Sequence, residues 1–183
     1  ISVSKKNIEK FKKEGIYKSK KLNIRSFKVY GDGALGSRGA VLKSPYCDDP
    51  HNYGILRTSA EDLKFYAKEI AEMGFQMNTH AIGDSTVSVL LNEYKKILKD
   101  IDDPRWRIEH SQVVDINEFE LYNEKILPSI QPTHATSDMY WAYDRLGSRI
   151  KGAYAFKDLL NSSSRVALGT DFPVEKVNPF HTF

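Results

Sequence analysis

The sequence predicts an α/β fold, more narrowly part of a (β/α)8 TIM barrel, on three observations. Short apolar runs typical of strands alternate with amphipathic stretches typical of helices, which indicates βαβ units and a parallel sheet. Four of the five strand-like runs carry a polar side chain at or near the carboxyl end, where barrels keep their sites. Five strands are too few to close a barrel, since a complete one takes about 250 residues.

The expected elements follow one another regularly. Strands are expected at residues 23–30, 75–79, 106–109, 126–131 and 165–168. Helices with one apolar face are expected at residues 4–14, 59–74, 83–98, 115–124 and 154–160. Ser4 and Ser59 suit the N-caps of the first two helices, and Gly15 suits the end of the first. Residues 31–57 form a long loop, which makes this stretch a candidate functional loop.

Composition limits the class of protein. The chain is 40% hydrophobic and 28% charged with a net charge of +3, an ordinary globular composition. Glu9 and Glu14 interrupt the lysines near the start, and no aromatic pattern accompanies them, so we expect no nucleic-acid partner. Cys47 is the only cysteine, which excludes an intrachain disulfide and a cysteine-based metal knot. No apolar run approaches the roughly 20 residues that cross a bilayer, so we expect no membrane span in this piece.

The chain is expected to be one incomplete domain over residues 1–183. It contains no repeat, low-complexity tract or linker. It opens on Ile1 rather than Met, which indicates a piece of a longer protein whose earlier barrel strands are absent. A cytoplasmic location is expected for the longer protein.

The candidate site residues are the polar side chains at the strand ends: Lys28, His80, His110 and Asp171. A buried polar group is costly unless it has a partner. Imidazole nitrogens and a carboxylate oxygen are good ligands for zinc and related divalent ions. Burial lowers the pKa of a lysine, and a neutral amine can react with CO2 to give a carbamate that binds metal as a carboxylate does. We therefore expect one or two divalent ions, with zinc as the expected metal.

Each of these residues also has a structural interpretation. Lys28 alone suits a snorkelling lysine or an ion pair at the mouth of a barrel. The two histidines could be hydrogen-bonded core residues, and Asp171 could cap a following helix. Four such coincidences at equivalent positions are less probable than one shared site, so the metal site is favoured.

Three further residues are candidates for contact with a substrate. His134 lies slightly past the strand that ends at Gln131, which suits a substrate contact or a general acid better than a metal ligand. Asp32 and Arg38 lie in the long loop above the mouth, and Arg38 could clamp a carboxylate or carbonyl. A loop histidine bonded to backbone and a surface arginine are the structural alternatives. Glu109 is expected to point to the opposite face of its strand from His110.

Five motifs together resemble the amidohydrolase superfamily, and most closely amidohydrolase family 3, the YtcJ-like branch that includes N-substituted formamide deformylase. The motifs are K-V-Y-x-D-G-x-L-G-S-R, T-H-A-I-G-D, R-x-R-I-E-H-S-Q, Q-P-x-H-x-x-x-D and A-L-G-T-D-F-P-V. The resemblance covers residues 25–179. Each motif alone is weak, and their order is what makes the resemblance specific.

The resemblance implies a metal centre at the mouth of a barrel, with this chain supplying strands 4 to 8. It implies that Lys28 is the family's carboxylated lysine, that His80 and His110 are metal ligands, and that Asp171 is both ligand and proton shuttle. The implied activity is hydrolysis of an amide-type C–N bond, other than a peptide bond, in a small molecule by metal-activated water.

One family feature is absent. The family carries an H-x-H pair on its first strand, and this chain contains no H-x-H. We therefore expect the fragment alone to be inactive, to bind metal incompletely, and to self-associate through exposed barrel edges. Two other functions stay open: a metal-free barrel lyase that uses Lys28 as a Schiff-base amine, and a catalytically dead barrel that acts as a binding module.

Overall fold

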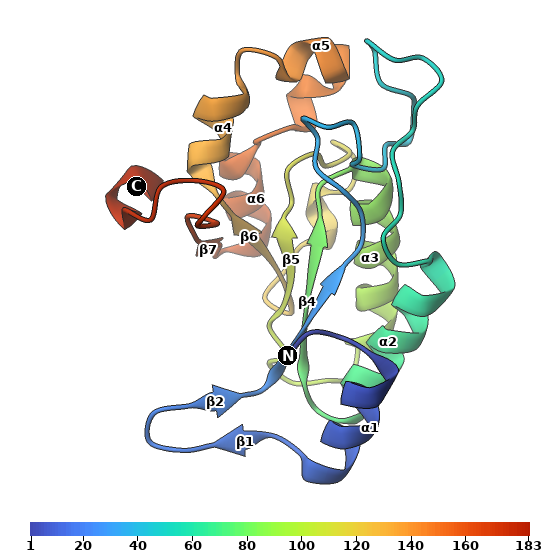
Figure 1. The fold of residues 1–183 in the computed structure, drawn as a ribbon, viewed down its shortest axis with the longest axis vertical. Helices are drawn as coiled ribbons and strands as arrows, with labels where there is room; N and C mark the ends of the chain where they lie inside the picture. The colour runs from blue at the N-terminus through green and yellow to red at the C-terminus, as the bar shows by residue number, and fades with distance from the viewer.

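A computed structural model describes residues 1–183 and shows a mixed α/β fold built on one parallel sheet (Figure 1). The sheet has five strands in the order β3-β4-β5-β6-β7, so each strand pairs with the next one along the chain. Such an order lacks the reversal that defines a doubly wound sheet, and it is the order found in the wall of a barrel. The predicted parallel α/β fold is confirmed.

The strands are short, and two of them form a separate antiparallel hairpin, β1–β2. Their bounds are Tyr17–Lys18 (β1), Asn23–Ile24 (β2), Ser26–Tyr30 (β3), Gln76–Ala81 (β4), Trp106–His110 (β5), Ile126–Ile130 (β6) and Ala167–Leu168 (β7). The α-helices are Lys5–Glu14 (α1), Ala60–Glu72 (α2), Asp84–Ile97 (α3), Pro132–Asp138 (α4), Ala142–Leu146 (α5) and Phe156–Ser163 (α6). Three 3-10 turns lie at Phe119–Leu121, Gly147–Gly152 and Pro179–Thr182. None of these helices combines the length and the apolar character that a membrane span requires.

Local signals explain where the first helices begin and end. The hydroxyl of Ser4 accepts a hydrogen bond from the Asn7 amide at 3.1 Å, and that of Ser59 accepts one from the Asp62 amide at 3.0 Å. Each bond satisfies one of the amides that a helix start leaves free. Gly15 ends α1 with φ = 69°, a left-handed conformation that glycine adopts at little cost.

The register of the sheet separates a helix-facing side from a side that carries polar residues. Lys28 pairs with Asn78, and His80 pairs with Tyr30 on one side and Glu109 on the other. Paired residues of neighbouring strands point to the same face. Glu109 therefore lies on the face that carries Lys28 and His80, not on the helix-facing side.

The main core fills the helix-facing side and contains 22 buried residues. Phe27, Met77 and Trp106 are among its fully buried side chains. Phe11 of α1 meets Phe27 edge-on, with ring centroids 6.0 Å apart. This core packs one face of the sheet against the helices. The polar face and the carboxyl ends of the strands are left for the site.

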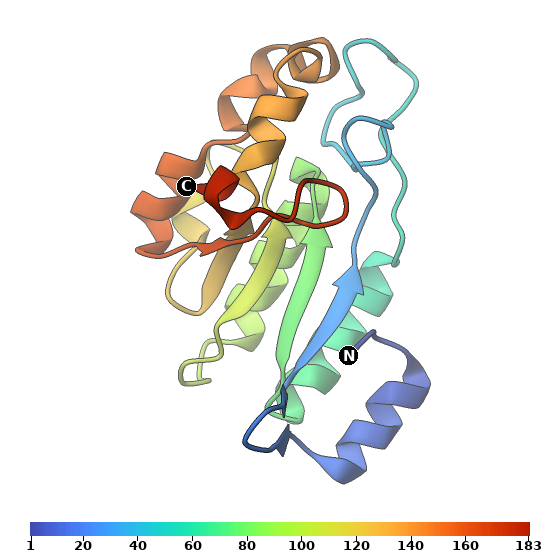
Figure 2. The same cartoon turned by 60° about the vertical axis from the view of Figure 1, so that its left-hand side comes forward.

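A second buried cluster holds the long loop over the carboxyl ends of the strands. It contains eight buried residues, among them Leu35, Leu42 and Tyr46 from the loop and Leu146 from α5. The hydroxyl of Tyr46 donates a hydrogen bond to the Ala40 carbonyl at 2.7 Å inside this cluster. Figure 2 shows the loop between β3 and α2 and the α4–α5 region together above the ends of the arrows.

Two stretches differ from the sequence-based expectations. Residues 115–124 contain only the 3-10 turn at Phe119–Leu121. The Asp115 side chain accepts a hydrogen bond from the Asn117 amide and forms an ion pair with Lys43. No element was predicted for residues 132–152, and this stretch forms α4, α5 and a 3-10 turn. Pro132 stops β6 as expected, but it also begins α4, a position where its missing N–H costs nothing.

The first residues pair along the outer edge of β3. The Lys28 amide donates to the Ile1 carbonyl at 2.6 Å, and the Val3 amide donates to the Lys28 carbonyl at 3.0 Å, in a parallel bridge. This edge is therefore partly covered at Lys28. Self-association through exposed barrel edges stays a prediction.

Candidate metal centre

The carboxyl ends of β4 and β5, helix α4 and the segment after β7 surround a cavity of about 280 Å³. Its polar lining consists of His80, His110, Gln112, His134, Asp138 and Asp171. Its apolar lining consists of Ala34, Leu35, Ile82, Trp141 and Val174. Four of the seven predicted site residues line this cavity: His80, His110, His134 and Asp171. The carboxyl ends of parallel strands lie at one edge of the sheet, which brings segments that follow different strands together.

His80 and His110 lie side by side on neighbouring strands. Their ring centroids are 4.5 Å apart, and the rings meet edge-on at 69°. His110 is the last residue of β5 and has φ = 77°, and Ser111 has φ = 44°. Such left-handed backbone at residues other than glycine is strained and clusters at functional sites. Ser111 is held there because its hydroxyl bonds the Ile108 carbonyl at 3.0 Å and accepts from Tyr122 at 2.8 Å.

The two imidazoles carry buried nitrogens that lack partners. Nε2 of His80 and Nδ1 of His110 make no hydrogen bond. Burial lowers the pKa of His80, and burial, assisted by the neighbouring cationic groups, lowers the pKa of His110 to about 3. Both rings are therefore neutral near pH 7, and each offers a lone pair. An unpartnered buried nitrogen is costly unless a ligand completes it.

His134 and Asp171 complete a cluster with His110. One ligand atom of each residue lies within 4.8 Å of the others. Nε2 of His134 is 3.4 Å from Oδ2 of Asp171, and Asp171 has φ = 55° in the turn that follows β7. Two imidazoles and a carboxylate are the donor set of zinc and similar divalent ions. These residues fit a divalent cation, with His80 next to His110.

Lys28 is not among the residues that line the cavity. It is the third of the five residues of β3 and pairs with Asn78, two residues below the level of His80. Burial lowers its pKa, although the charges of Glu109 and Asp171 act in the opposite direction, and its Nζ lies 5.3 Å from the centre of the Tyr30 ring. A lowered pKa is what carboxylation of the amine requires. The metal-ligand role of Lys28 stays a prediction.

Asp32 and Arg38 are both engaged with the protein. The Asp32 carboxylate is 2% exposed and accepts three hydrogen bonds of 2.9 to 3.0 Å from the amides of Val41, Ile82 and Gly83. Arg38 forms a two-pronged pair with Asp48, at 3.1 Å from Nε and 2.9 Å from Nη2. The substrate contacts predicted for Asp32 and Arg38 stay predictions. In the structure, the hydrogen bonds of Asp32 and the ion pair of Arg38 hold the long loop in place.

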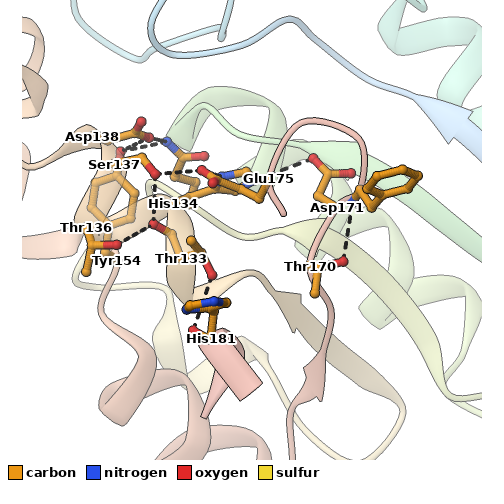
Figure 3. Close-up of polar contacts among 12 residues, drawn as sticks. Thr133, His134, Thr136, Ser137, Asp138, Tyr154, Thr170, Asp171, Glu175 and His181 are labelled. Atoms are coloured by element: carbon orange, nitrogen blue, oxygen red, sulfur yellow. Dashed lines mark hydrogen bonds and ion pairs between the residues drawn. The ribbon is translucent and has the colours of Figure 1, made fainter. Parts of the chain in front are cut away.

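Sequence reasoning missed two polar partners of the site. Oε1 of Glu175 lies 3.2 Å from Nδ1 of His134, on the side of the ring away from Asp171 (Figure 3). Asp138 accepts hydrogen bonds from the Tyr154 hydroxyl at 2.7 Å and from Gln112 at 3.2 Å. His134 and Asp138 are four residues apart, a spacing that places two side chains on the same face of a helix. A prediction of helix α4 would therefore have brought them together.

A family model described as "Amidohydrolase family" matches residues 1–183 of the chain. The chain belongs to this amidohydrolase family. The YtcJ-like resemblance is confirmed at the level of the family, since the match covers the whole chain.

Two curated relatives and two solved structures support the assignment. The chain is 33% identical to Protein LONG AFTER FAR-RED 3 of Arabidopsis thaliana over 174 residues, which are 92% of the chain and 30% of that protein. It is 36% identical to "Putative amidohydrolase YtcJ" of Bacillus subtilis (strain 168) over 156 residues, 84% of the chain and 29% of that protein. The chain therefore spans about a third of the length of the curated relatives that it matches.

The solved structures resemble the whole fold of this amidohydrolase chain. An uncharacterized metal-dependent hydrolase from Pyrococcus horikoshii is 30% identical, with a TM-score of 0.84 over 97% of the chain and 36% of that structure. A second one, from Pyrococcus furiosus, is 29% identical, with a TM-score of 0.86 over 97% of the chain and 37% of that structure. The relation to metal-dependent hydrolases agrees with a donor set that fits a divalent cation.

Proposed function

We propose that this chain is the later part of a metal-dependent hydrolase that cleaves a C–N bond, amide-type but not peptide, in a small molecule. The observation that carries the proposal is the cluster at the strand ends. Two neutral imidazoles with unpartnered nitrogens lie beside a carboxylate, inside a cavity of about 280 Å³. Membership of the amidohydrolase family and the likeness to metal-dependent hydrolases support it.

Each residue of the cluster has a task in this proposal. His80, His110 and Asp171 would hold a divalent cation, for which zinc is the expected metal. When bound, such an ion lowers the pKa of a water molecule and polarises the carbonyl of the substrate. Asp171 lies at the rim of the cluster with its side chain 37% exposed. It can therefore accept the proton of the attacking water and deliver it to the leaving amine.

The cavity also suggests the kind of substrate. Its apolar wall, with Trp141 and Leu35, suits an apolar substituent, while Asp138 faces the same space as an acceptor. The Tyr154 hydroxyl and the Gln112 amide bond one oxygen of Asp138, which holds the side chain in place. An N–H or hydroxyl of the substrate would suit its other oxygen.

Metal content and activity of the intact protein test the proposal. We expect divalent metal in the purified protein, hydrolysis of a panel of N-substituted amides, and loss of both on chelation. His110→Ala should remove metal and activity, while His51→Ala, an exposed loop histidine, should leave both unchanged. Intact protein that holds no divalent metal and hydrolyses amides equally well with a chelator would refute the proposal.

Lys28 keeps one alternative open. Burial lowers its pKa, which is also what a Schiff-base amine needs. Borohydride treatment in the presence of carbonyl compounds would label Lys28 if the protein were a metal-free lyase. Retention of metal-free activity together with this labelling would favour the lyase. The inactivity of this chain alone and a cytoplasmic location of the longer protein also stay predictions.

A further inference from the structure

We propose that the candidate cavity selects a small molecule that carries an ammonium group, and that Asp138 is the specificity-determining residue that binds this group. The proposed function leaves the charge of the substrate open. That the selected molecule is a substrate rests on the proposed function, whereas the preference for a cation does not.

A hydrogen-bond network holds the Asp138 carboxylate in place. The Tyr154 hydroxyl and the Gln112 side-chain nitrogen donate to Oδ2 of Asp138 at 2.7 Å and 3.2 Å, and the same nitrogen lies 2.7 Å from the Tyr154 hydroxyl (Figure 3). Gln112 is buried, and its backbone carbonyl accepts a hydrogen bond from the Tyr154 amide at 2.8 Å. Tyr154 has φ = 52°, a strained conformation that clusters at functional sites. The carboxylate is therefore fixed before a ligand arrives, which reduces the cost of binding.

The second oxygen of Asp138 has no partner in the chain. Both hydrogen bonds go to Oδ2, and no lysine or arginine pairs with the carboxylate. Arg145 of the next helix pairs with Asp48 instead. Burial raises the pKa of Asp138, and the hydrogen bond from Tyr154 opposes that shift, because donors favour the ionised form. A half-buried carboxylate without a cation is costly, and an ammonium group would remove this cost through a charge-assisted hydrogen bond.

The rest of the cavity also favours a cation over an anion. No lysine or arginine lines it, and its second carboxylate belongs to Asp171. The Trp141 ring lines the same cavity, and the face of an aromatic ring attracts cations. Leu35 and Val174 add apolar surface for the carbon chain that carries the ammonium group. A ligand carboxylate, by contrast, would meet two carboxylates and no cationic side chain.

Two other roles of Asp138 make different predictions. Asp138 could serve only to fasten α4 to the segment that contains Tyr154, in which case the charge of a ligand would not matter. Alternatively, Asp171 could be the carboxylate that attracts a cationic ligand. Asp138→Asn separates these roles, because it removes the charge while its side-chain oxygen can still accept from Tyr154 and Gln112.

Calorimetric titration of the intact protein in chelating buffer measures the preference directly. The probes are the monoacetamide of trimethylenediamine, the acetamide of n-butylamine and the acetamide of γ-aminobutyrate. They share one amide group and a chain of three methylene groups, and they end in an ammonium, a methyl and a carboxylate group. We expect the ammonium probe to bind about 10-fold or more tightly than the methyl probe, and the carboxylate probe to bind most weakly.

Charge-removing variants identify the responsible carboxylate. In Asp138→Asn the difference between the ammonium and methyl probes should fall below about 3-fold. Asp171→Asn should keep the preference for the ammonium probe. The matched control is Asp144→Asn, which removes an exposed carboxylate of α5 that makes no side-chain hydrogen bond or ion pair, and it should keep the preference too.

The wild-type protein alone can overturn the inference. Equal binding of the ammonium and methyl probes, tighter binding of the carboxylate probe, or no measurable binding of the ammonium probe would each do so. A preference for the ammonium probe that survives in Asp138→Asn, or that disappears in Asp171→Asn, would overturn the role of Asp138 as well.

Failure of this inference can be told from failure of the proposed function. The expected preference in an intact protein that neither holds metal nor hydrolyses amides would refute the proposed function alone. A metal-dependent amide hydrolase that binds the ammonium and methyl probes equally would refute only the inference about Asp138.

Discussion

Removal of the Asp32 carboxylate should lower the free energy of unfolding of the chain. Both oxygens accept hydrogen bonds from buried backbone: Oδ1 from the Ile82 amide at 3.0 Å, and Oδ2 from the amides of Val41 and Gly83 at 2.9 Å each. The carboxylate thereby ties the long loop to the turn between β4 and α3. Burial raises the pKa of Asp32, and the three backbone bonds oppose that shift.

The magnitude follows from the three donors. A buried donor left without an acceptor costs about 1–3 kcal/mol. The three amides that Asp32→Ala leaves without an acceptor would therefore cost about 3–9 kcal/mol of stability in total. Relief of the cost of burying a carboxylate offsets part of this, and we expect a net loss of about 3–5 kcal/mol. Asp32→Asn can keep the two bonds of Oδ2 and lose only that to Ile82, so we expect it to cost about 1–3 kcal/mol.

Urea unfolding of the chain, followed by circular dichroism, measures both losses. Asp100→Ala is the matched control, because this exposed carboxylate makes no hydrogen bond or ion pair, and we expect a change within about 0.5 kcal/mol. A loss below about 1 kcal/mol for Asp32→Ala would refute the fastening role. If the intact Asp32→Ala protein also lost activity while it stayed equally stable, the substrate contact predicted from the sequence would be favoured instead.

Two further predictions concern stability. A Cβ on Gly83 would collide with the Val41 carbonyl, so Gly83→Ala should cost at least about 1–3 kcal/mol in urea unfolding, while Gly169→Ala, which meets nothing within 4 Å, should change little. The pKa of His110 is about 3 in the folded chain against an ordinary value of 6.5, so between these pH values only the unfolded chain binds this proton. The free energy of unfolding in chelating buffer should therefore fall as the pH decreases from 6.5, by up to about 1.4 kcal/mol per pH unit. His110→Asn should make this pH dependence less steep. Equal pH dependence in the two chains would contradict the lowered pKa of His110.

The parts of the fold that sequence reasoning predicted correctly depend on neighbours in the chain. The caps of α1 and α2 are contacts between residues three apart, and the apolar faces of these helices repeat with helical spacing. The strands were found as short apolar runs, although their bounds moved by up to three residues and the run 23–30 divides into β2 and β3. The helix expected at residues 115–124 is absent, and the contact of Asp115 with Lys43, 72 residues away, is one that no local pattern records.

The candidate site also contains residues that local sequence predicts and residues that only the fold brings together. His80 and His110 were identifiable because each lies at or next to the carboxyl end of a buried strand, and the strand ends of a parallel sheet share one edge. The place of Lys28 below the others depends on the register between β3 and β4, which no local pattern records. Glu175 gave no signal, because its partner His134 lies elsewhere in the chain. Asp138 is the last residue of the Q-P-x-H-x-x-x-D motif, but no local pattern indicated its contact with Tyr154.

The sequence by itself determined the parallel α/β class, the family resemblance and the types of ligand that gather at the strand ends, because these follow from local periodicity and from which residue ends each strand. Only the tertiary structure decided which of those side chains meet. It placed His134 beside Asp171 and Glu175, set Asp32 among three backbone amides, and left Lys28 two residues below the level of His80. Distances between segments far apart in the chain depend on strand register and on how the long loop packs, and these are properties of the whole fold.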